Sequence, residues 1–256
     1  MGEVSRYPEG TFCWIDLGTT DVPEARAFYA ALFGWDMEDL EGYTLCRLGG
    51  QIVTGFHQHT PEEGTGWSSN ICVEDAEVAT TRARELGAGV LVEPGEIEGT
   101  GKVSSIRDPS GAEVALWQPL EHVGAQVVNE IGTWSWNELV TVDLEAARAF
   151  YGRLFGWDAE AVPGPIPRTS FSMGRLLIGG GHAPAPGEEA RPRWTVSFRV
   201  SDADRSAARA GELGGTILLP PMDIPVGRMS IVADPGGASF TVAAVPGGAL
   251  RGVDGS

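Results

Sequence analysis

Hydrophobic and polar positions along this chain form short alternating runs, with an amphipathic segment after each leading run. Alternation over 11–17 predicts a strand, after which Asp21 and Pro23 cap and open a helix that ends at Gly34. Two short apolar runs within 43–56, separated by a Gly-Gly pair, are typical of a β-hairpin. The pattern predicts a unit of one strand, one helix and two or three further strands.

The same unit returns three more times along the chain. The second unit is predicted as strand 68–73, helix 75–86 and strands 89–92, 102–106 and 113–117. The third and fourth are predicted as strand 133–140, helix 143–154, strands near 171 and at 176–178, then strand 195–200, helix 202–213 and strands near 217, at 229–232 and at 239–243. We therefore expect four βαβββ modules, two in each half of the chain.

The two halves are also copies of each other in sequence. Residues 25–36 and 147–158 are identical at ten of twelve positions, 122 residues apart. Further repeated positions are Gly10-Thr11 with Gly132-Thr133, Trp14 with Trp136, Trp67 with Trp194, and 107–111 with 233–237. This is the signature of a duplicated domain. We expect a first domain over 8–120, a linker over 121–130, a second domain over 131–246 and a flexible tail over 247–256.

Net charge and cysteine content indicate which kinds of partner and which cellular compartment to expect. The 256 residues carry a formal net charge of -17, which repels phosphate backbones and anionic lipid surfaces, so neither nucleic acid nor membrane is an expected partner. Three cysteines, Cys13, Cys46 and Cys72, all in the first half, suit a reducing compartment. The chain is expected to be cytoplasmic, to bind a small molecule, and to be a monomer or a homodimer.

Strand alternation divides each predicted sheet into two chemically different faces, because residues two apart share a face. Apolar residues fit the face beneath the helices: Ile15, Leu17, Val196, Phe198 and Val200. The other face mixes indole, carboxylate and small polar groups: Trp14, Asp16, Ser68, Asn70, Cys72, Ala115, Trp117, Trp136, Glu138, Thr195, Ser197, Arg199, Thr241 and Ala243. Candidate chemistry therefore lies on this second face.

Three motifs together resemble the vicinal oxygen chelate superfamily: FYxxLFGW after a helix, GG between short strands, and DPxG before a last strand. That superfamily includes glyoxalase I, extradiol dioxygenases and bleomycin-binding resistance proteins, and the chain most resembles its actinobacterial two-repeat glyoxalase-like members. The resemblance implies an α+β fold of two tandem domains. Each domain would consist of two βαβββ modules forming a cupped mixed sheet with helices on the outside. Whether modules pair within a repeat or are swapped between repeats or chains stays open.

The resemblance also implies where a metal would be held, on the first and last strands of each module. Those positions fall on Trp14, Ser68, Ala115 and 54–55 in the first repeat, and on Trp136, Thr195, Thr241 and 179–180 in the second. None supplies the imidazole, carboxylate or thiolate donors that zinc, nickel or iron need. We therefore expect neither a metal of the family type nor another cofactor.

The four histidines are expected to lie away from those positions. His57 and His59 are placed in a loop after the fourth strand, His122 in the linker and His182 before a proline-rich loop. We interpret His57 and His59 as solvated loop residues, with a weak surface metal pair as the alternative.

Asp16 and Glu138 are the candidate acid or base residues, because a carboxylate on an apolar face has a raised pKa and can transfer protons near neutral pH. The alternative is a carboxylate bonded to backbone or paired with an arginine such as Arg199. Trp14 and Trp136 either form an aromatic wall for a flat ligand or fill the core. The predicted ligand-binding set is Trp14, Ser68, Asn70, Trp117, Trp136, Thr195, Ser197 and Arg199.

Two functions from different classes fit these residues. The leading hypothesis is metal-independent binding of an aromatic or apolar metabolite, in sequestration or resistance. The alternative is a glyoxalase-like lyase, isomerase or hydroxylase-type enzyme that acts on a small carbonyl compound through Asp16 or Glu138. A protein-interaction role is a third, non-catalytic class.

Overall fold

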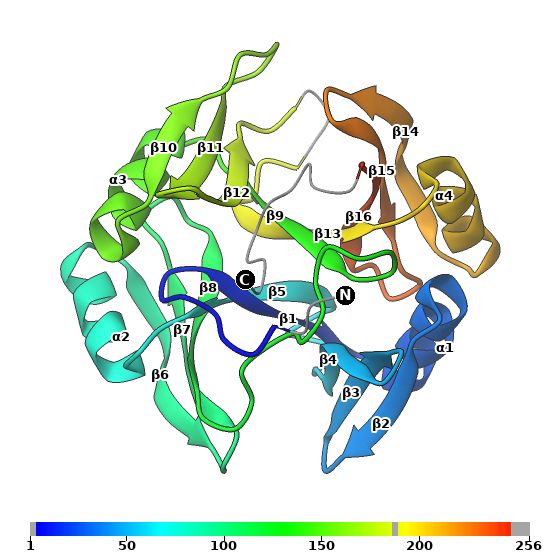
Figure 1. Cartoon of the computed structure of the whole chain (residues 1–256), viewed down its shortest axis with the longest axis horizontal. Helices are drawn as coiled ribbons and strands as arrows, with labels where there is room; N and C mark the ends of the chain where they lie inside the picture. The colour runs from blue at the N-terminus through cyan, green and yellow to red at the C-terminus, as the bar shows by residue number, and fades with distance from the viewer. Residues whose placement is uncertain (1–3, 186–188, 247–256) are drawn as a thin grey trace.

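The computed structural model describes residues 4–185 and 189–246, which form two eight-stranded sheets with two helices each (Figure 1). The first domain contains β1 (Phe12–Thr19), α1 (Val22–Phe33), β2 (Asp36–Leu40), β3 (Tyr43–Leu48), β4 (Gln51–Gln58), β5 (Gly66–Cys72), α2 (Ala76–Glu85), β6 (Gly89–Ile97), β7 (Gly101–Arg107) and β8 (Glu113–Pro119). The second contains β9 (Trp134–Val140), α3 (Leu144–Phe155), β10 (Asp158–Ala161), β11 (Arg168–Met173), β12 (Leu176–His182), β13 (Arg193–Arg199), α4 (Ala203–Glu212), β14 (Thr216–Ile224), β15 (Gly227–Ala233) and β16 (Ser239–Ala244). The expected tail over 247–256 lies outside the described residues.

Each sheet is built from the two modules of one repeat. The strand orders are β2-β3-β4-β1-β5-β8-β7-β6 and β10-β11-β12-β9-β13-β16-β15-β14. The modules join where β1 runs antiparallel to β5, and where β9 runs antiparallel to β13. This arrangement confirms the expected α+β fold of two tandem domains, each made of two βαβββ modules, and shows that modules pair within a repeat.

Every helix begins in the way its sequence predicts. The carboxylates of Asp21, Asp75, Asp143 and Asp202 each accept a hydrogen bond from the backbone N–H three residues further on. Gly34 and Gly156 end α1 and α3 in the left-handed conformation, each with φ of 74°, which glycine adopts without strain.

The edge strands differ most from the prediction. β6 extends to Ile97 and β14 to Ile224 although Pro94 and Pro220-Pro221 lie within them. Both strands are at the edge of their sheets, and their pairing shifts register around the prolines. Because proline needs no ladder partner on an open edge, the strand continues past it.

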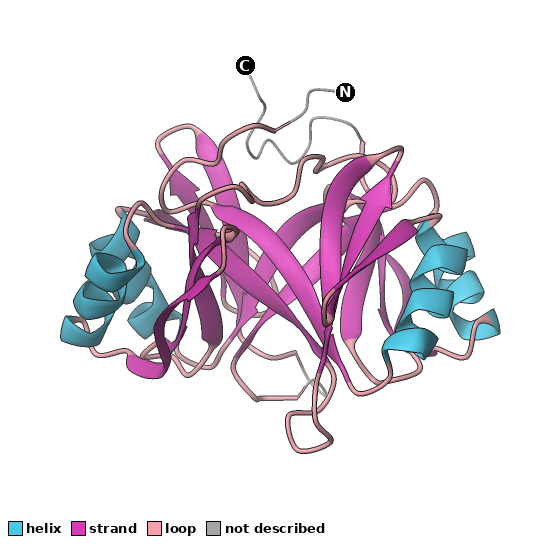
Figure 2. Cartoon of the chain, turned by 90° about the horizontal axis from the view of Figure 1, so that it is seen from below, coloured by secondary structure: helices cyan, strands magenta, loops and turns pink. Residues whose placement is uncertain are grey.

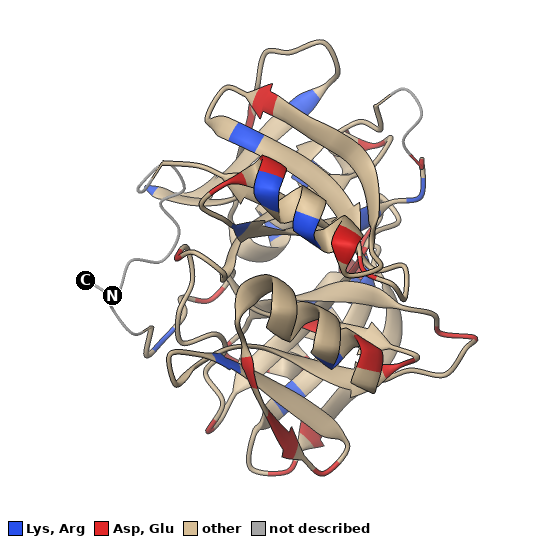
Figure 3. Cartoon of the chain, turned by 90° about the vertical axis from the view of Figure 1, so that its right-hand side faces the viewer, with Lys and Arg blue, Asp and Glu red and all other residues tan. Residues whose placement is uncertain are grey.

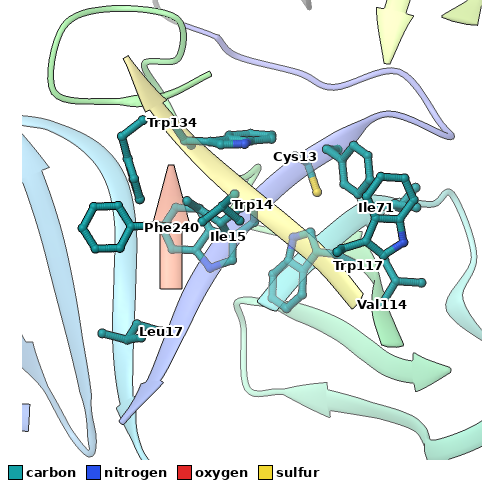
Figure 4. Close-up of a cluster of buried hydrophobic side chains, with 14 of the residues drawn as sticks. Cys13, Trp14, Ile15, Leu17, Ile71, Val114, Trp117, Trp134 and Phe240 are labelled. Carbon is teal, nitrogen blue, oxygen red and sulfur yellow. The ribbon is translucent and has the colours of Figure 1, made fainter. Parts of the chain in front are cut away.

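The two sheets pack against each other at their centres, with β5 against β13 (Figure 1). Helix α1 lies beside α4 and α2 beside α3, at the two flanks of this contact (Figure 2). The core is continuous across both domains: Ile15 and Leu17 of β1 belong to the same buried cluster as Trp134 and Phe240 of the second domain (Figure 4). The face of each sheet turned away from the other domain is called its outer face below.

Acidic and basic residues are interspersed along the visible ribbon (Figure 3). Several form ion pairs, such as Arg228 with Asp204 and Asp223. No helix within the described part of the chain has the length and apolar character needed to cross a membrane.

Candidate functional site

Asp16 is the centre of a polar cluster on the outer face of the first sheet. On β5, Ser69 accepts a hydrogen bond from Asn137 of the second domain, so the alternate residues Ser68 and Asn70 point to the outer face. The Ser68 hydroxyl and the Asn70 amide both donate to Asp16 Oδ1, the amide at 3.2 Å. The predicted clustering of these three residues on one face is thus what the structure shows.

The second oxygen of Asp16 faces an imidazole. His57 Nδ1 lies 3.5 Å from Asp16 Oδ2, and the Asp16 side chain is 19% exposed. His57 was predicted in a loop, but β4 extends to Gln58, so it is a strand residue that pairs with Gly18 of β1. The parallel pairing of β1 with β4 brings this histidine to the cluster.

Trp14 and Tyr43 form the apolar side of the cluster. The Trp14 indole donates to the Tyr43 hydroxyl at 3.2 Å, and the indole is only 4% exposed. The Tyr43 ring lies over Gly55, where an added Cβ would be 2.2 Å from it. Burial raises the pKa of Tyr43 well above 10.0, and the nearby Asp16 charge adds to the shift, so the phenol stays protonated.

The linker completes this side of the site with His122. Its ring packs edge-on against Trp14 with centroids 4.5 Å apart, and its backbone carbonyl accepts from the Trp117 indole at 3.0 Å. Burial lowers the pKa of His122 from 6.5 to about 4, against the opposing effect of Asp16. His122 is therefore a neutral aromatic wall near pH 7, and Trp14 and Trp117 are packed side chains.

The outer face of the second sheet has a different electrostatic arrangement. Glu138 accepts from the Trp136 indole at 2.6 Å and pairs with Arg168 at 3.3 Å, and its side chain is 18% exposed. Glu138 is therefore paired with Arg168 on β11 and not with Arg199. A Cβ on Gly180 would meet the Glu138 carboxylate at 2.4 Å, so this glycine provides the space in which the carboxylate lies.

Two other predicted residues of the second sheet, Thr195 and Arg199, donate side-chain hydrogen bonds to backbone carbonyls. The Thr195 hydroxyl donates to the Glu138 carbonyl at 3.1 Å. Arg199 donates to the carbonyls of Asn129 at 2.6 Å and Val245 at 3.3 Å, which ties the linker and the last strand to β13. Ser197 is buried. Among the predicted residues of this sheet, Trp136 bonds to the Glu138 carboxylate, whereas Thr195 bonds to its backbone carbonyl.

Two hollows adjoin the second of these clusters, since Trp136 lines one and Arg168 lines the other. One, of about 40 Å³, lies between the domains beside Trp134, Asn129 and Asn137. The other is a groove of about 670 Å³ beside the start of α3 and the turn 161–169. The first is far below the several hundred cubic ångströms that a drug-sized ligand fills.

Comparison with known proteins places the fold in a family. A family model described as a glyoxalase-like domain matches residues 13–117 and again residues 136–243. The chain belongs to the glyoxalase-like family.

Relatives of this glyoxalase-like chain match it over nearly its whole length. CFP32 of Mycobacterium tuberculosis, provisionally named a glyoxylase, is 37% identical over 257 residues, covering 94% of this chain and 97% of that protein. DnrV of Streptomyces peucetius, named an anthracycline biosynthesis protein, is 32% identical over 260 residues, covering 93% and 94%.

Solved structures share the fold at low sequence identity. The Mn(II)-bound glyoxalase from Novosphingobium aromaticivorans matches with a TM-score of 0.66 at 15% identity, covering 96% of this chain and 86% of that one. The 2,3-dioxygenase LapB from Pseudomonas sp. KL28 matches with a TM-score of 0.62 at 15% identity, covering 99% and 97%. The fold is that of the vicinal oxygen chelate superfamily.

The residues present do not fit the metal that such neighbours suggest. At the centre of the first sheet, the expected ligand positions hold Trp14, Gly55, Ser68 and Ala115, and Trp14 is buried against Tyr43. Within residues 4–185 and 189–246, no three or more His, Cys, Asp or Glu side chains are grouped to hold a metal ion. We therefore assign no metal-dependent chemistry to the centre of the first sheet.

Sequence reasoning missed Tyr43, His57 and Arg168 as site residues. His57 lies on β4, the strand beside β1, whereas Tyr43 on β3 and Arg168 on β11 lie one strand further from the first strand of their domain. All three come near their carboxylates through this strand order. Gly18 and Gly55 carried a usable signal, since a glycine inside a strand often marks the close approach of another group.

Proposed function

We propose that this glyoxalase-like protein binds a small organic molecule on the outer face of its first sheet, independently of a metal. The ligand class is an aromatic or otherwise apolar molecule that bears a hydroxyl group. The observation that carries the proposal is the Asp16 carboxylate, partly exposed and held by Ser68 and Asn70.

The chemistry around Asp16 supports this ligand class. A carboxylate oriented by two neutral donors accepts a further hydrogen bond from a ligand hydroxyl with little reorganisation. Ser68 is exposed, so solvent and a ligand can reach the cluster, while the half-buried Tyr43 ring, held by the buried Trp14 indole, supplies an apolar side. Few polar groups beside an aromatic wall are the usual composition of a small-molecule site.

The first domain is the better candidate of the two. The partner of Glu138 is the permanently charged Arg168 at 3.3 Å, whereas Asp16 faces the imidazole of His57, at 3.5 Å. A hydrogen bond from a ligand contributes less binding free energy when the accepting carboxylate is already paired with an arginine. The name of DnrV, which refers to anthracyclines, a class of aromatic compounds, supports an aromatic ligand.

An enzymatic function is the second candidate, and the contact between Asp16 and His57 favours it. A carboxylate within reach of an imidazole can accept a proton from a bound carbonyl compound and pass it on. The provisional name of CFP32 as a glyoxylase supports a small carbonyl substrate.

Binding is tested with EDTA-treated protein and 1,4-dihydroxyanthraquinone as the probe, followed by quenching of tryptophan fluorescence. We expect saturable binding that Asp16→Asn weakens at least about tenfold, the size of one charge-assisted hydrogen bond. Glu138→Gln, the matched change in the second domain, should leave the affinity unchanged. Binding that appears only after a metal is added back overturns the proposal.

Turnover of a carbonyl substrate, such as the hemithioacetal of methylglyoxal, distinguishes the enzymatic alternative from binding alone. If Asp16→Asn keeps the affinity for the probe and abolishes turnover, the protein is an enzyme and Asp16 is its base. If wild-type protein binds the probe and turns over no such substrate, the binding function stands.

A further inference from the structure

His57 and His59 form a pair at one end of the Asp16 cluster that the proposed function does not use. His57 lies in β4 and His59 directly after its end, where the His59 N–H still bonds to the Thr19 carbonyl of β1, so the two side chains share a face. Their rings are 4.7 Å apart, and their Nε2 atoms face each other at 3.0 Å. The His57 side chain is 33% exposed, so a dissolved ion can reach the pair.

The other nitrogen of each ring has an acceptor next to it. His59 Nδ1 lies 2.9 Å from the Gly64 carbonyl, and His57 Nδ1 lies 3.5 Å from the Asp16 carboxylate. An imidazole that donates its Nδ1–H has an Nε2 lone pair available, and metal-binding histidines are held by such carboxylate or carbonyl partners. Both rings are thus oriented with their metal-binding atoms converging.

A glycine on the neighbouring strand provides the space for this arrangement. A Cβ at Gly18 would lie 2.0 Å from Cε1 of His59, so the ring occupies the place of a side chain on β1. Gly18 pairs with His57 in the sheet, which fixes both rings relative to one strand position. The pair is therefore positioned by the sheet and not only by its own loop.

We propose that His57 and His59 bind one divalent transition-metal ion through their Nε2 atoms, at a site separate from the family's ligand positions. With metal–nitrogen bonds of about 2.1 Å, two nitrogens 3.0 Å apart subtend about 90° at the metal. This is the angle between neighbouring ligands of an octahedral ion such as Ni²⁺. A tetrahedral ion would need the nitrogens to separate by only about 0.4 Å more.

The protein supplies two ligands, and water completes the coordination. The net charge of -17 favours cations in general, and the Asp16 carboxylate lies 3.5 Å from the His57 ring. Two imidazoles favour late first-row ions, so affinity should rise from Co²⁺ to Ni²⁺ to Cu²⁺. The metal would bind the histidine Nε2 atoms and not the Ser68–Asn70 side of Asp16, so the two proposed sites share Asp16 but have no ligating atom in common.

The second domain provides an internal comparison. His182 corresponds to His57 at the end of β12, but Pro184 stands where the first domain has His59, and Val140 stands where it has Gly18. The second sheet thus lacks both the second imidazole and the space for it. One metal ion per chain is expected.

The test is isothermal titration of tag-free, EDTA-treated protein with NiCl₂ at pH 7.5. We expect one Ni²⁺ per chain, with His57→Asn and His59→Asn each weakening binding at least about tenfold. Asp16→Asn should weaken it about 10- to 100-fold through the loss of its support of His57. His182→Asn should leave binding unchanged.

Gly18→Ala removes no ligand and tests the placement. The added methyl would displace the His59 ring, so binding should fall while the melting temperature, followed by circular dichroism, shows that the protein still folds. No saturable binding by wild-type protein, or binding that persists in both histidine variants, overturns the proposal. His59→Asn should keep its affinity for the anthraquinone probe, so failure of the metal site and failure of the organic site are distinguishable.

Discussion

At the scale of the residue, burial divides the three histidines around Asp16 into two kinds. His57 and His59 are partly exposed and face a carboxylate and a carbonyl. His122 packs between Trp14 and Trp117, and burial lowers its pKa to about 4. The same side chain is thus a candidate ligand in one place and an aromatic wall in the other.

His122 should make the protein less stable on mild acidification. Its pKa is about 4 when folded and 6.5 when unfolded, so below pH 6.5 the unfolded chain binds the proton more tightly. The free energy of unfolding should fall by about 3 kcal/mol from this residue as the pH drops from 6.5 to 4. Urea unfolding of wild-type and His122→Phe protein across this range isolates the effect. An equally steep pH dependence in the variant would contradict the prediction.

At the scale of the element, the four helices begin alike because each module carries an aspartate before its helix. A carboxylate at this position satisfies a backbone N–H that has no partner inside the helix and lies near the positive end of the helix dipole. The repetition at Asp21, Asp75, Asp143 and Asp202 shows that helix starts are encoded locally.

Asp143→Ala should lower the free energy of unfolding by about 1 kcal/mol, because the N–H of Ala146 loses its acceptor at 2.9 Å. Asp143→Asn keeps an accepting oxygen and should cost clearly less. Guanidinium unfolding of the three proteins measures both values. Equal losses in the two variants would mean that the charge of Asp143, and not the hydrogen bond, matters.

At the scale of the whole molecule, the repeated motifs hold the two domains together. The Tyr29 hydroxyl donates to Asp234 of the second domain at 3.1 Å, and Tyr151 donates to Asp108 of the first at 2.8 Å. Trp35 and Trp157 likewise donate to the carbonyls of Gly132 and Gly10 across the interface. The tyrosine of one repeat thus meets the DPxG turn of the other, so each motif has a role that no single repeat explains.

Tyr151→Phe should lower the free energy of unfolding by about 1–3 kcal/mol, because it leaves a buried Asp108 oxygen and the Trp194 indole without their partner. Burial already raises the pKa of Asp108, so its carboxylate tolerates the loss poorly. Tyr29→Phe should have an effect of similar size. Glu145→Gln, an exposed change on the same helix as Tyr151, is the control and should stay within about 0.5 kcal/mol in urea unfolding. Wild-type stability in Tyr151→Phe would show that the interface does not depend on this bond.

The sequence by itself determined the modules, their helices and the face on which candidate chemistry lies. Aspartate caps, glycine stops and the two-residue period of strands act over a few residues, so they can be read from Asp21, Gly34 or the pair Trp14 and Asp16 directly. The internal repeat and the family motifs also predicted that these modules form two tandem domains.

Only the tertiary structure decided which residues meet. Strand order brings Tyr43 and His57 to Asp16, and Arg168 to Glu138, from positions 27 or more residues away. The packing of two sheets turned Tyr29 and Asp234 into a contact across domains. These pairings depend on long-range register and on space left by Gly18, Gly55 and Gly180, which local sequence does not encode.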